Sequence, residues 1–262
     1  MRQAAFSYSL LWVALAACGG SDDKSANVDA PSGGGTDAPS GPGPIDAPGG
    51  GTAITITGTA VERTAGGMSP VSGATIAAYQ NGNDATPVVM TTSMADGTFS
   101  LSVPAAGGPL DGYLKATKAG LKDTYLYPPA PISADTVAPV NMISPDTLNL
   151  LVLLAIGAGN QQAGKGLIAL VVVNGATATS MPIAGVAVTS NPAASATIYN
   201  GSNGLPDRAA NGTGADGTAF LFNVASNANV TVSATKTGST FTSHSVKAWP
   251  DQFTTTLITP SP

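Results

Sequence analysis

Few side chains in this 262-residue sequence could perform chemistry, and the clearest motif is incomplete. The stretch GNQQAGKG at 159–166 has the Gly-x-x-x-x-Gly-Lys spacing of a phosphate-binding loop, but Gly166 stands where that loop needs serine or threonine to hold Mg²⁺. The next residues, LIALVVV, are predicted to form a strand, whereas a phosphate loop opens a helix. We therefore expect no nucleotide binding.

Hydrolytic catalysis also lacks its usual groups. His244 is the single histidine and lies on the alternating stretch FTSHSV, which predicts an exposed strand residue. No Gly-x-Ser-x-Gly elbow accompanies it, and Glu62, the only glutamate, belongs to no His-Glu-x-x-His zinc motif. Asp96 and Asp216 precede glycines in predicted turns; their oxygens could hold Ca²⁺, although turn formation already explains them. The sequence predicts a protein that is not an enzyme and uses no cofactor.

Cys18 is the only cysteine, so the chain has no internal disulfide. Arg2 and the apolar residues 10–17 before it form a run that is too short to cross a bilayer but typical of an export signal. Residues 15–18 resemble the lipobox of bacterial lipoproteins, in which the nucleophilic thiol is acylated and the signal is cut before it. The resemblance implies a signal peptide at 1–17 and a membrane anchor at Cys18, held by several acyl chains.

The residue after the cysteine predicts the destination of the protein. Gly19, rather than aspartate, follows the cysteine, which by resemblance to Gram-negative lipoproteins favours the outer membrane and the cell surface. The alternative is an ordinary secretory signal with an incidental cysteine.

Residues 18–51 repeat Asp-Ala-Pro between Gly, Ser and Pro and hold no apolar run, so we expect a disordered tether.

From residue 52 the chain contains the same blocks twice. The first stretch, AITITGTAV, alternates as a half-buried strand does, and PVSGATIAAY (70–79), ADGTFSLSV (95–103) and LKATKAG (114–120) follow. PIAGVAVTS (182–190), ADGTAFLFNV (215–224) and VSATKTG (232–238) repeat them in order, and Tyr127-Pro128 corresponds to Trp249-Pro250. One extra residue after Thr218 predicts a bulge or a late strand start, with Phe220, Phe222 and Val224 on one face. The sequence therefore predicts a duplicated unit.

These blocks resemble the carboxypeptidase regulatory-like domain, and the second copy departs further from it because it lacks the aromatic residue directly after Asp-Gly-Thr. The resemblance implies an all-β fold of two transthyretin-like antiparallel β-sandwiches, at 52–143 and 166–262. It relates them to the accessory domain of carboxypeptidases and not to the zinc-bearing catalytic domain.

A connecting segment at 144–165 separates the two copies. Ser144 suits a helix N-cap, Pro145 the first helical position and Gly157 the C-terminal stop. The helix between them is apolar nearly all round, so we expect it to be buried between the sandwiches; docking on a partner is the alternative.

The remaining candidates are aromatic. Tyr127 and Trp249 are the best placed to stack on a sugar ring, although sandwich cores also need aromatic residues. The formal charge of −5 and the scattered basic residues exclude a nucleic-acid surface. We therefore expect a lipid-anchored surface protein whose non-catalytic modules make structural or adhesive contacts with surface proteins; the alternative is a carbohydrate-binding lipoprotein.

Overall fold

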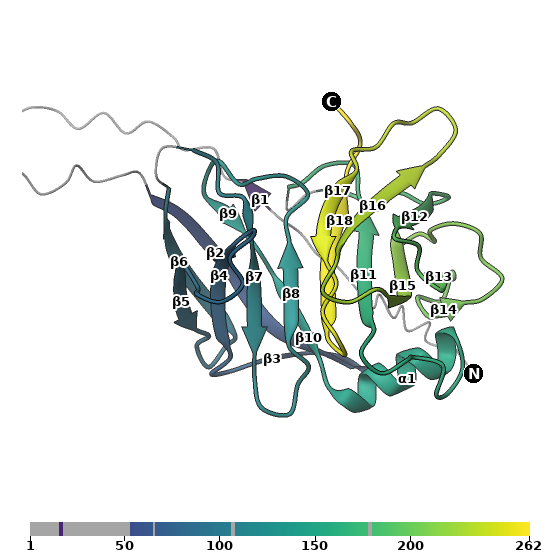
Figure 1. Ribbon diagram of the computed structural model, residues 1–262, viewed down its shortest axis with the longest axis horizontal. Helices are drawn as coiled ribbons and strands as arrows, with labels where there is room; N and C mark the ends of the chain where they lie inside the picture. The colour runs from purple at the N-terminus through teal and green to yellow at the C-terminus, as the bar shows by residue number, and fades with distance from the viewer. Residues whose placement is uncertain (1–15, 18–52, 65, 106–107, 178–179) are drawn as a thin grey trace, which may run out of the picture.

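The computed structural model describes residues 16–17, 53–64, 66–105, 108–177 and 180–262. The predicted lipidation site at Cys18, the tether and most of the predicted signal peptide lie outside the described residues. The described chain is mostly β-structure with one short helix, which confirms the all-β prediction (Figure 1). No helix in these ranges is long and apolar enough to cross a membrane.

One sheet is centred on the long strand β2. It contains β1 (Ala16–Ala17), β2 (Ala53–Thr64), β3 (Gly67–Pro70), β6 (Thr98–Pro104), β9 (Thr136–Val137) and β10 (Val140–Ile143). β2 pairs with β6 and β3 in the antiparallel sense and with β10 and β9 in the parallel sense.

A nine-stranded sheet runs through the whole molecule. Its order is β14 (Pro206–Asp207), β13 (Ala196–Asn200), β15 (Thr218–Val224), β11 (Gly166–Val172), β18 (Phe253–Ile258), β8 (Thr124–Tyr127), β7 (Gly112–Thr117), β4 (Thr75–Gln80) and β5 (Val89–Thr92). A third sheet has the order β12 (Ala187–Asn191), β16 (Asn229–Thr235) and β17 (His244–Lys247).

The two repeats found in the sequence have the same strand pairing. In the first half, β2 pairs antiparallel with β6 and parallel with β10; in the second half, β11 pairs antiparallel with β15 and parallel with β18. The antiparallel series β4, β7, β8 corresponds to β12, β16, β17. The prediction of purely antiparallel sandwiches is wrong in one respect, because the first and last strands of each repeat lie parallel.

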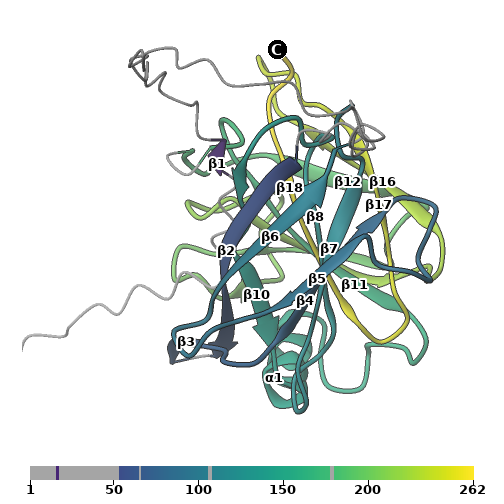
Figure 2. The ribbon, with the colours of Figure 1, turned by 90° about the vertical axis from the view of Figure 1, so that its left-hand side faces the viewer.

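The two halves share a sheet, and the helix is not their only link. β18, the last strand of the second half, pairs in parallel with β8 of the first half, which places it at the middle of the nine-stranded sheet (Figure 1). Figure 2 shows the first half facing the viewer, with β2 and β10 in one layer and β4, β5 and β7 in the other. The β2 sheet packs on one face of the nine-stranded sheet, and the third sheet packs on the opposite face at its other end.

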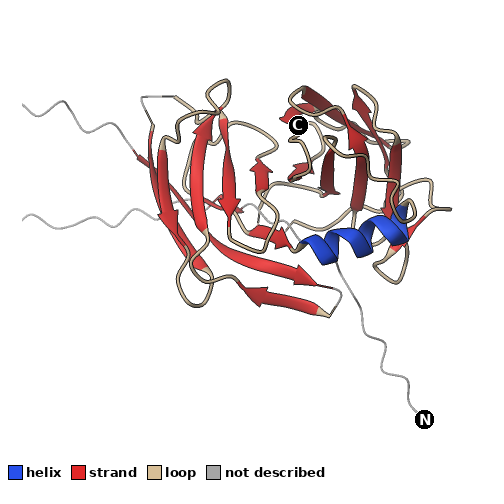
Figure 3. Cartoon of the chain, turned by 60° about the horizontal axis from the view of Figure 1, so that its bottom comes forward, coloured by secondary structure: helices blue, strands red, loops and turns tan. Residues whose placement is uncertain are grey.

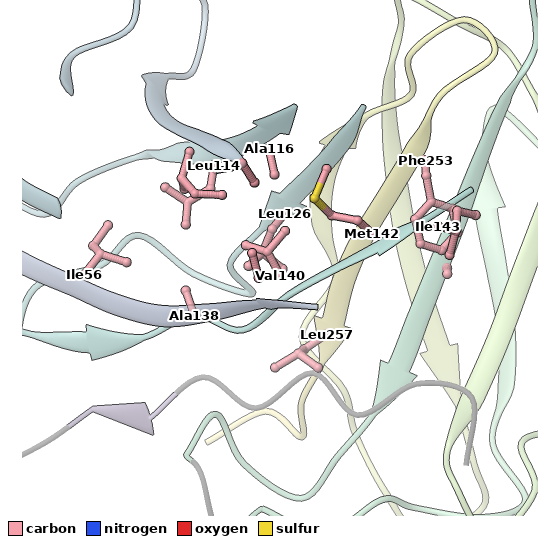
Figure 4. Packing of buried hydrophobic residues seen from close by; sticks show 14 of the residues in the cluster. Ile56, Leu114, Ala116, Leu126, Ala138, Val140, Met142, Ile143, Phe253 and Leu257 are labelled. Carbon is pink, nitrogen blue, oxygen red and sulfur yellow. The ribbon is translucent and has the colours of Figure 1, made fainter. Parts of the chain in front are cut away.

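The central strands are consequently buried on both faces. Every residue of β11, β15 and β18 is buried, as is usual for strands covered from both sides. One core cluster continues from the first half into the second: Figure 4 shows Met142 and Ile143 of β10 close to Phe253 of β18. Thr255 and Thr256 of β18 are buried because their hydroxyls donate to the carbonyls of Tyr125 and Tyr127 on β8.

Helix α1 (Pro145–Ala155) begins and ends as predicted. The Ser144 hydroxyl accepts a hydrogen bond from the Thr147 N–H at 3.3 Å, and Gly157 has a φ of 98° just beyond the last turn. Figure 3 shows α1 extending from the end of β10 along the second half. The prediction that this helix is buried is wrong for one side of it: Val152 and Ala155 are buried, while Leu150, Leu153 and Leu154 are 38–49% exposed.

The extra residue of the second repeat forms a bulge at the far end of β15. The register against β11 shifts between the pairs Gly166–Val224 and Ile168–Leu221, and Asn223 has a φ of 54°. The bulge reverses the direction of the next side chain, so Val224 joins the opposite core from Phe220 and Phe222. The prediction of a bulge is confirmed, but its expected place directly after Thr218 and the expected shared face of these three residues are wrong.

Candidate ligand-binding cleft

Five aromatic side chains gather where the second half meets the first. Tyr79 of β4 and Tyr113 of β7 are directly opposite in register and stack with ring centroids 5.3 Å apart. Tyr127 of β8 stacks on Tyr113 at 4.8 Å, and Trp249, which follows β17, stacks on Tyr125 at 4.4 Å. We call these residues the aromatic cluster. Its four tyrosines lie on the face of the first half that points away from the β2 sheet, because alternate residues of a strand point to opposite faces.

The structure thus brings together the two predicted sugar-stacking residues, but it covers their ring faces. Tyr127 is only 3% exposed and Trp249 is half-buried, since the rings stack on one another. Lys247 covers the other face of the Trp249 ring, with its Nζ 4.3 Å from the ring centroid. The cluster therefore works first as the interface between the halves.

A polar cleft of about 440 Å³ opens beside this interface. Its walls come from the loop after β4, the residue before β7, the turn between β15 and β16, and strand β17, an edge strand of the third sheet. The lining residues are Asn81, Gly82, Asp84, Asp111, Tyr127, Asn227, Asn229, Ser245, Val246 and Lys247. The volume is in the range of sites for small ligands, and the position between two halves is a common one.

Asp84 connects the two halves across the cleft. Its carboxylate accepts a hydrogen bond from the Tyr113 hydroxyl at 2.8 Å through Oδ1, and Oδ2 pairs with the Lys247 ammonium group of β17. Burial alone would raise the pKa of Asp84, but the hydrogen bonds from Lys247 and Tyr113 and the charge of Lys247 together lower it. Asp84 is therefore a carboxylate at neutral pH, and Lys247 is its counter-ion.

Two other carboxylate and amide groups fix the mouth of the cleft. The Asn81 side chain donates to Asp111 Oδ1 at 2.6 Å, and the Asn81 backbone N–H donates to the Asp111 carbonyl at 3.1 Å. On the other side, Asn227 has a φ of 57°, a left-handed conformation that asparagine tolerates better than most residues. Asp111 is exposed, so one side of its carboxylate faces solvent.

Tyr127 supplies the one buried polar atom of the cleft that the protein leaves unsatisfied. No hydrogen bond of normal geometry from a described residue reaches its Oη. Burial raises the pKa of Tyr127; the Trp249 indole and the Lys247 backbone lie close enough to oppose that shift in part. The hydroxyl is therefore protonated at any physiological pH, as both a donor and an acceptor.

His244 is not in the cleft, and the prediction that it is exposed is wrong. It is part-buried, with its Nε2 2.7 Å from Thr256 Oγ1. Because the Thr256 hydroxyl donates its proton to the Tyr127 carbonyl, its oxygen accepts from His244, which fixes the neutral tautomer with the proton on Nε2. Burial lowers the pKa of His244 to about 4.

The other candidates from the sequence have structural roles. Asp96 and Asp216 each accept a hydrogen bond from the backbone N–H two residues later, at 3.0 Å, in turns where Gly97 and Gly217 have positive φ. Within the described ranges, no three His, Cys, Asp or Glu side chains come together as metal ligands do. Lys165 belongs to a loop between α1 and β11 that does not begin a helix.

Most residues of the cleft were not predictable from the sequence. Asp84 and Lys247 are 163 positions apart, and nothing in either neighbourhood marks them. The usable signal was the density of tyrosines on β7 and β8, because aromatic residues on an outer strand face indicate that something covers that face. The arrangement has hydrogen-bonding groups and an aromatic floor, which can bind a ligand but do not pair a nucleophile with a base.

Comparison with known proteins gives little more. No family model matches the chain, and no curated protein matches it, so the resemblance to the carboxypeptidase regulatory-like domain stays a prediction. Among solved structures, the minor pilin GBS52 of Streptococcus agalactiae is 14% identical, with 80% of this chain and 97% of that chain covered and a TM-score of 0.26. The shaft pilin SpaA of Lactobacillus rhamnosus GG is 13% identical, with 80% and 99% covered and a TM-score of 0.26.

An enzyme is also among these structures. Chlorocatechol 1,2-dioxygenase from Pseudomonas putida is 13% identical, with 39% of this chain and 69% of that chain covered and a TM-score of 0.23. With TM-scores below 0.5, these similarities assign no role to this chain.

Proposed function

We propose that this protein is a lipid-anchored, non-catalytic protein of the bacterial cell surface that presents its two β-sheet halves as one rigid unit for structural or adhesive contacts. The observation that carries the proposal is the nine-stranded sheet, whose central parallel pair β18–β8 joins the halves. A sheet that continues through both halves leaves no hinge between them. Such a unit holds a binding surface in a fixed orientation at the end of a tether.

The anchoring part of the proposal rests on the lipobox-like residues 15–18 and on the tether composition of residues 19–51. A cysteine carrying several acyl chains remains in a membrane, whereas one chain binds only marginally. A segment of this length and composition would separate the folded unit from the lipid surface.

The test is expression of the full chain in a Gram-negative host with metabolic labelling by an alkyne fatty acid. We expect label on the mature protein, and we expect Cys18→Ala to lose the label and to accumulate as an uncleaved precursor. Gly19→Asp is the matched variant: it should stay labelled but fractionate with the inner membrane. Normal processing and membrane retention of Cys18→Ala would refute the anchor. Labelled protein that resists protease added to intact cells would refute surface display.

A further inference from the structure

We propose that the polar cleft between the halves binds a neutral saccharide, roughly one or two sugar rings in size by its volume of about 440 Å³. This inference names a ligand for the adhesive unit of the proposed function, but the cleft and its chemistry do not depend on lipidation. The proposal rests on the groups that line the cleft, on its charge and on the buried hydroxyl of Tyr127.

The lining groups suit hydroxyl ligands. Carboxylates accept, amides both donate and accept, and the lysine donates, so that a polyol, whose hydroxyls do both, can pair with every one of them. Asp111 and Asn81 stand at the mouth, Asn229 and Ser245 on the opposite wall. Val246 is the one aliphatic side chain of the lining, so the cleft lacks the apolar pocket that a peptide side chain would need.

Charge excludes the common ionic ligands. Asp84 and Asp111 give the lining two carboxylates against the single ammonium group of Lys247, so a phosphate or a uronic acid would meet repulsion. A metal ion would find Asp111 as its one unpaired carboxylate, because Lys247 already neutralises Asp84, and a single carboxylate supplies too few charged ligands for a metal site. The remaining chemistry is neutral and rich in hydroxyl groups.

The Tyr127 hydroxyl adds an observation that does not depend on charge. Its side chain is only 3% exposed, it lines the cleft, and its Oη makes no hydrogen bond of normal geometry, although the Trp249 indole and the Lys247 backbone lie close to it. Leaving a buried hydroxyl unpaired is costly, and native proteins rarely do so without a reason. A sugar hydroxyl could pair with the Tyr127 hydroxyl, whereas the ring faces of Tyr127 are covered by stacking and offer no platform to a sugar.

The test is binding of cellotetraose, mannotriose and chitotriose to the purified mature protein, measured by calorimetry and by the fluorescence of Trp249, the only tryptophan beyond residue 17. Heparin hexasaccharide is the anionic comparison. We expect at least one neutral probe to bind in the millimolar range or tighter, and heparin not to bind.

Variants locate the site. Tyr127→Phe removes only the hydroxyl and should weaken binding about two- to tenfold, and Asp111→Asn should weaken it about tenfold or more, with folding intact. Tyr199→Phe, at a buried tyrosine bonded to the Val188 backbone outside the cleft, and Asp96→Asn, in an exposed turn, are the matched controls and should leave binding unchanged.

Three results would overturn the inference: no binding of any neutral probe, binding that the cleft variants leave unchanged, or preference for heparin. None of them would touch the anchoring proposal, because labelling of Cys18 is measured separately. Conversely, an unlabelled protein that still binds a neutral probe through Tyr127 and Asp111 would refute the anchor and keep the site.

Discussion

The single histidine should make the stability of this protein depend on pH in a window where few other groups titrate. His244 has a pKa lowered to about 4 by burial, against 6.5 for an unperturbed histidine. Between pH 6.5 and about 4, His244 is therefore protonated in the unfolded chain but neutral in the folded chain. Stability is therefore complete above about pH 6.5 and is lost as the pH falls toward 4.

The size of the loss follows from the two pKa values. A difference of about 2.5 units corresponds to about 3 kcal/mol once the pH is below 4, and about 2 kcal/mol is already lost at pH 5. In a domain of this size, the loss of about 2 kcal/mol at pH 5 lowers the melting temperature by roughly 4–8 °C. Between pH 5 and 6.5 ordinary carboxylates stay ionised in both states, so the slope belongs to His244.

The assay is thermal unfolding of the wild type and of His244→Gln at intervals between pH 5 and 7.5. Glutamine keeps an amide N–H for Thr256 Oγ1 but cannot be protonated, so its melting temperature should stay flat in this window. NMR titration of the one imidazole gives the folded pKa directly. An equal slope in wild type and variant, or an imidazole that titrates near 6.5 in the folded protein, would refute the reasoning.

Two further predictions concern packing. Val152→Ala on the buried side of α1 should lower the free energy of unfolding by about 1–3 kcal/mol, whereas Leu153→Ser on its exposed side should change it by less than about 0.5 kcal/mol. Denaturant titration measures both values, and equal effects would contradict the burial described for this helix. Gly58→Ala should lower the free energy of unfolding by about 1–3 kcal/mol because its Cβ would collide with the Ala138 carbonyl and the Phe99 ring. Gly108→Ala, with open space around the new Cβ, is the control, and similar melting temperatures of the two variants would refute this contact.

Local features were predictable from the sequence because their causes are local. The bounds of α1 follow from Ser144, Pro145 and Gly157, and the turn at Gly97 follows from the need for positive φ. The duplication was also visible, and the strand pairing repeats with it.

The pairing of β18 with β8 was not predictable, because it joins residues about 130 positions apart and no local pattern specifies it. The residues Thr254, Thr255 and Thr256 look like the polar face of an ordinary strand. They can be buried because their hydroxyls bond to backbone carbonyls: Thr255 and Thr256 donate to β8, a contact that exists only once β8 lies beside them, and Thr254 donates to the Lys247 carbonyl of β17. For the leucines of α1 the error has the opposite sign. Their apolarity predicted burial, but three of them are exposed because the helix has a neighbour on one side only.

The same position in the two repeats shows why one outer face became an interface and the other did not. Tyr113 and Lys115 of β7 correspond to Thr231 and Ser233 of β16. In the second half these hydroxyls face their partners Ser245 and Ser243 across the strands, at 3.4 and 2.9 Å, on an exposed surface that water can cover.

In the first half the tyrosines make the equivalent surface apolar, and leaving it in water would be unfavourable. Trp249 of the second half covers it and stacks on Tyr125. Where that cover ends, the surface becomes polar again, and Asp84 and Lys247 tie the two halves together at the boundary. The cleft thus depends on a difference between the repeats: the aromatic residues on a single outer face make part of the contact between the halves, and the cavity at the edge of that contact is lined by residues of both.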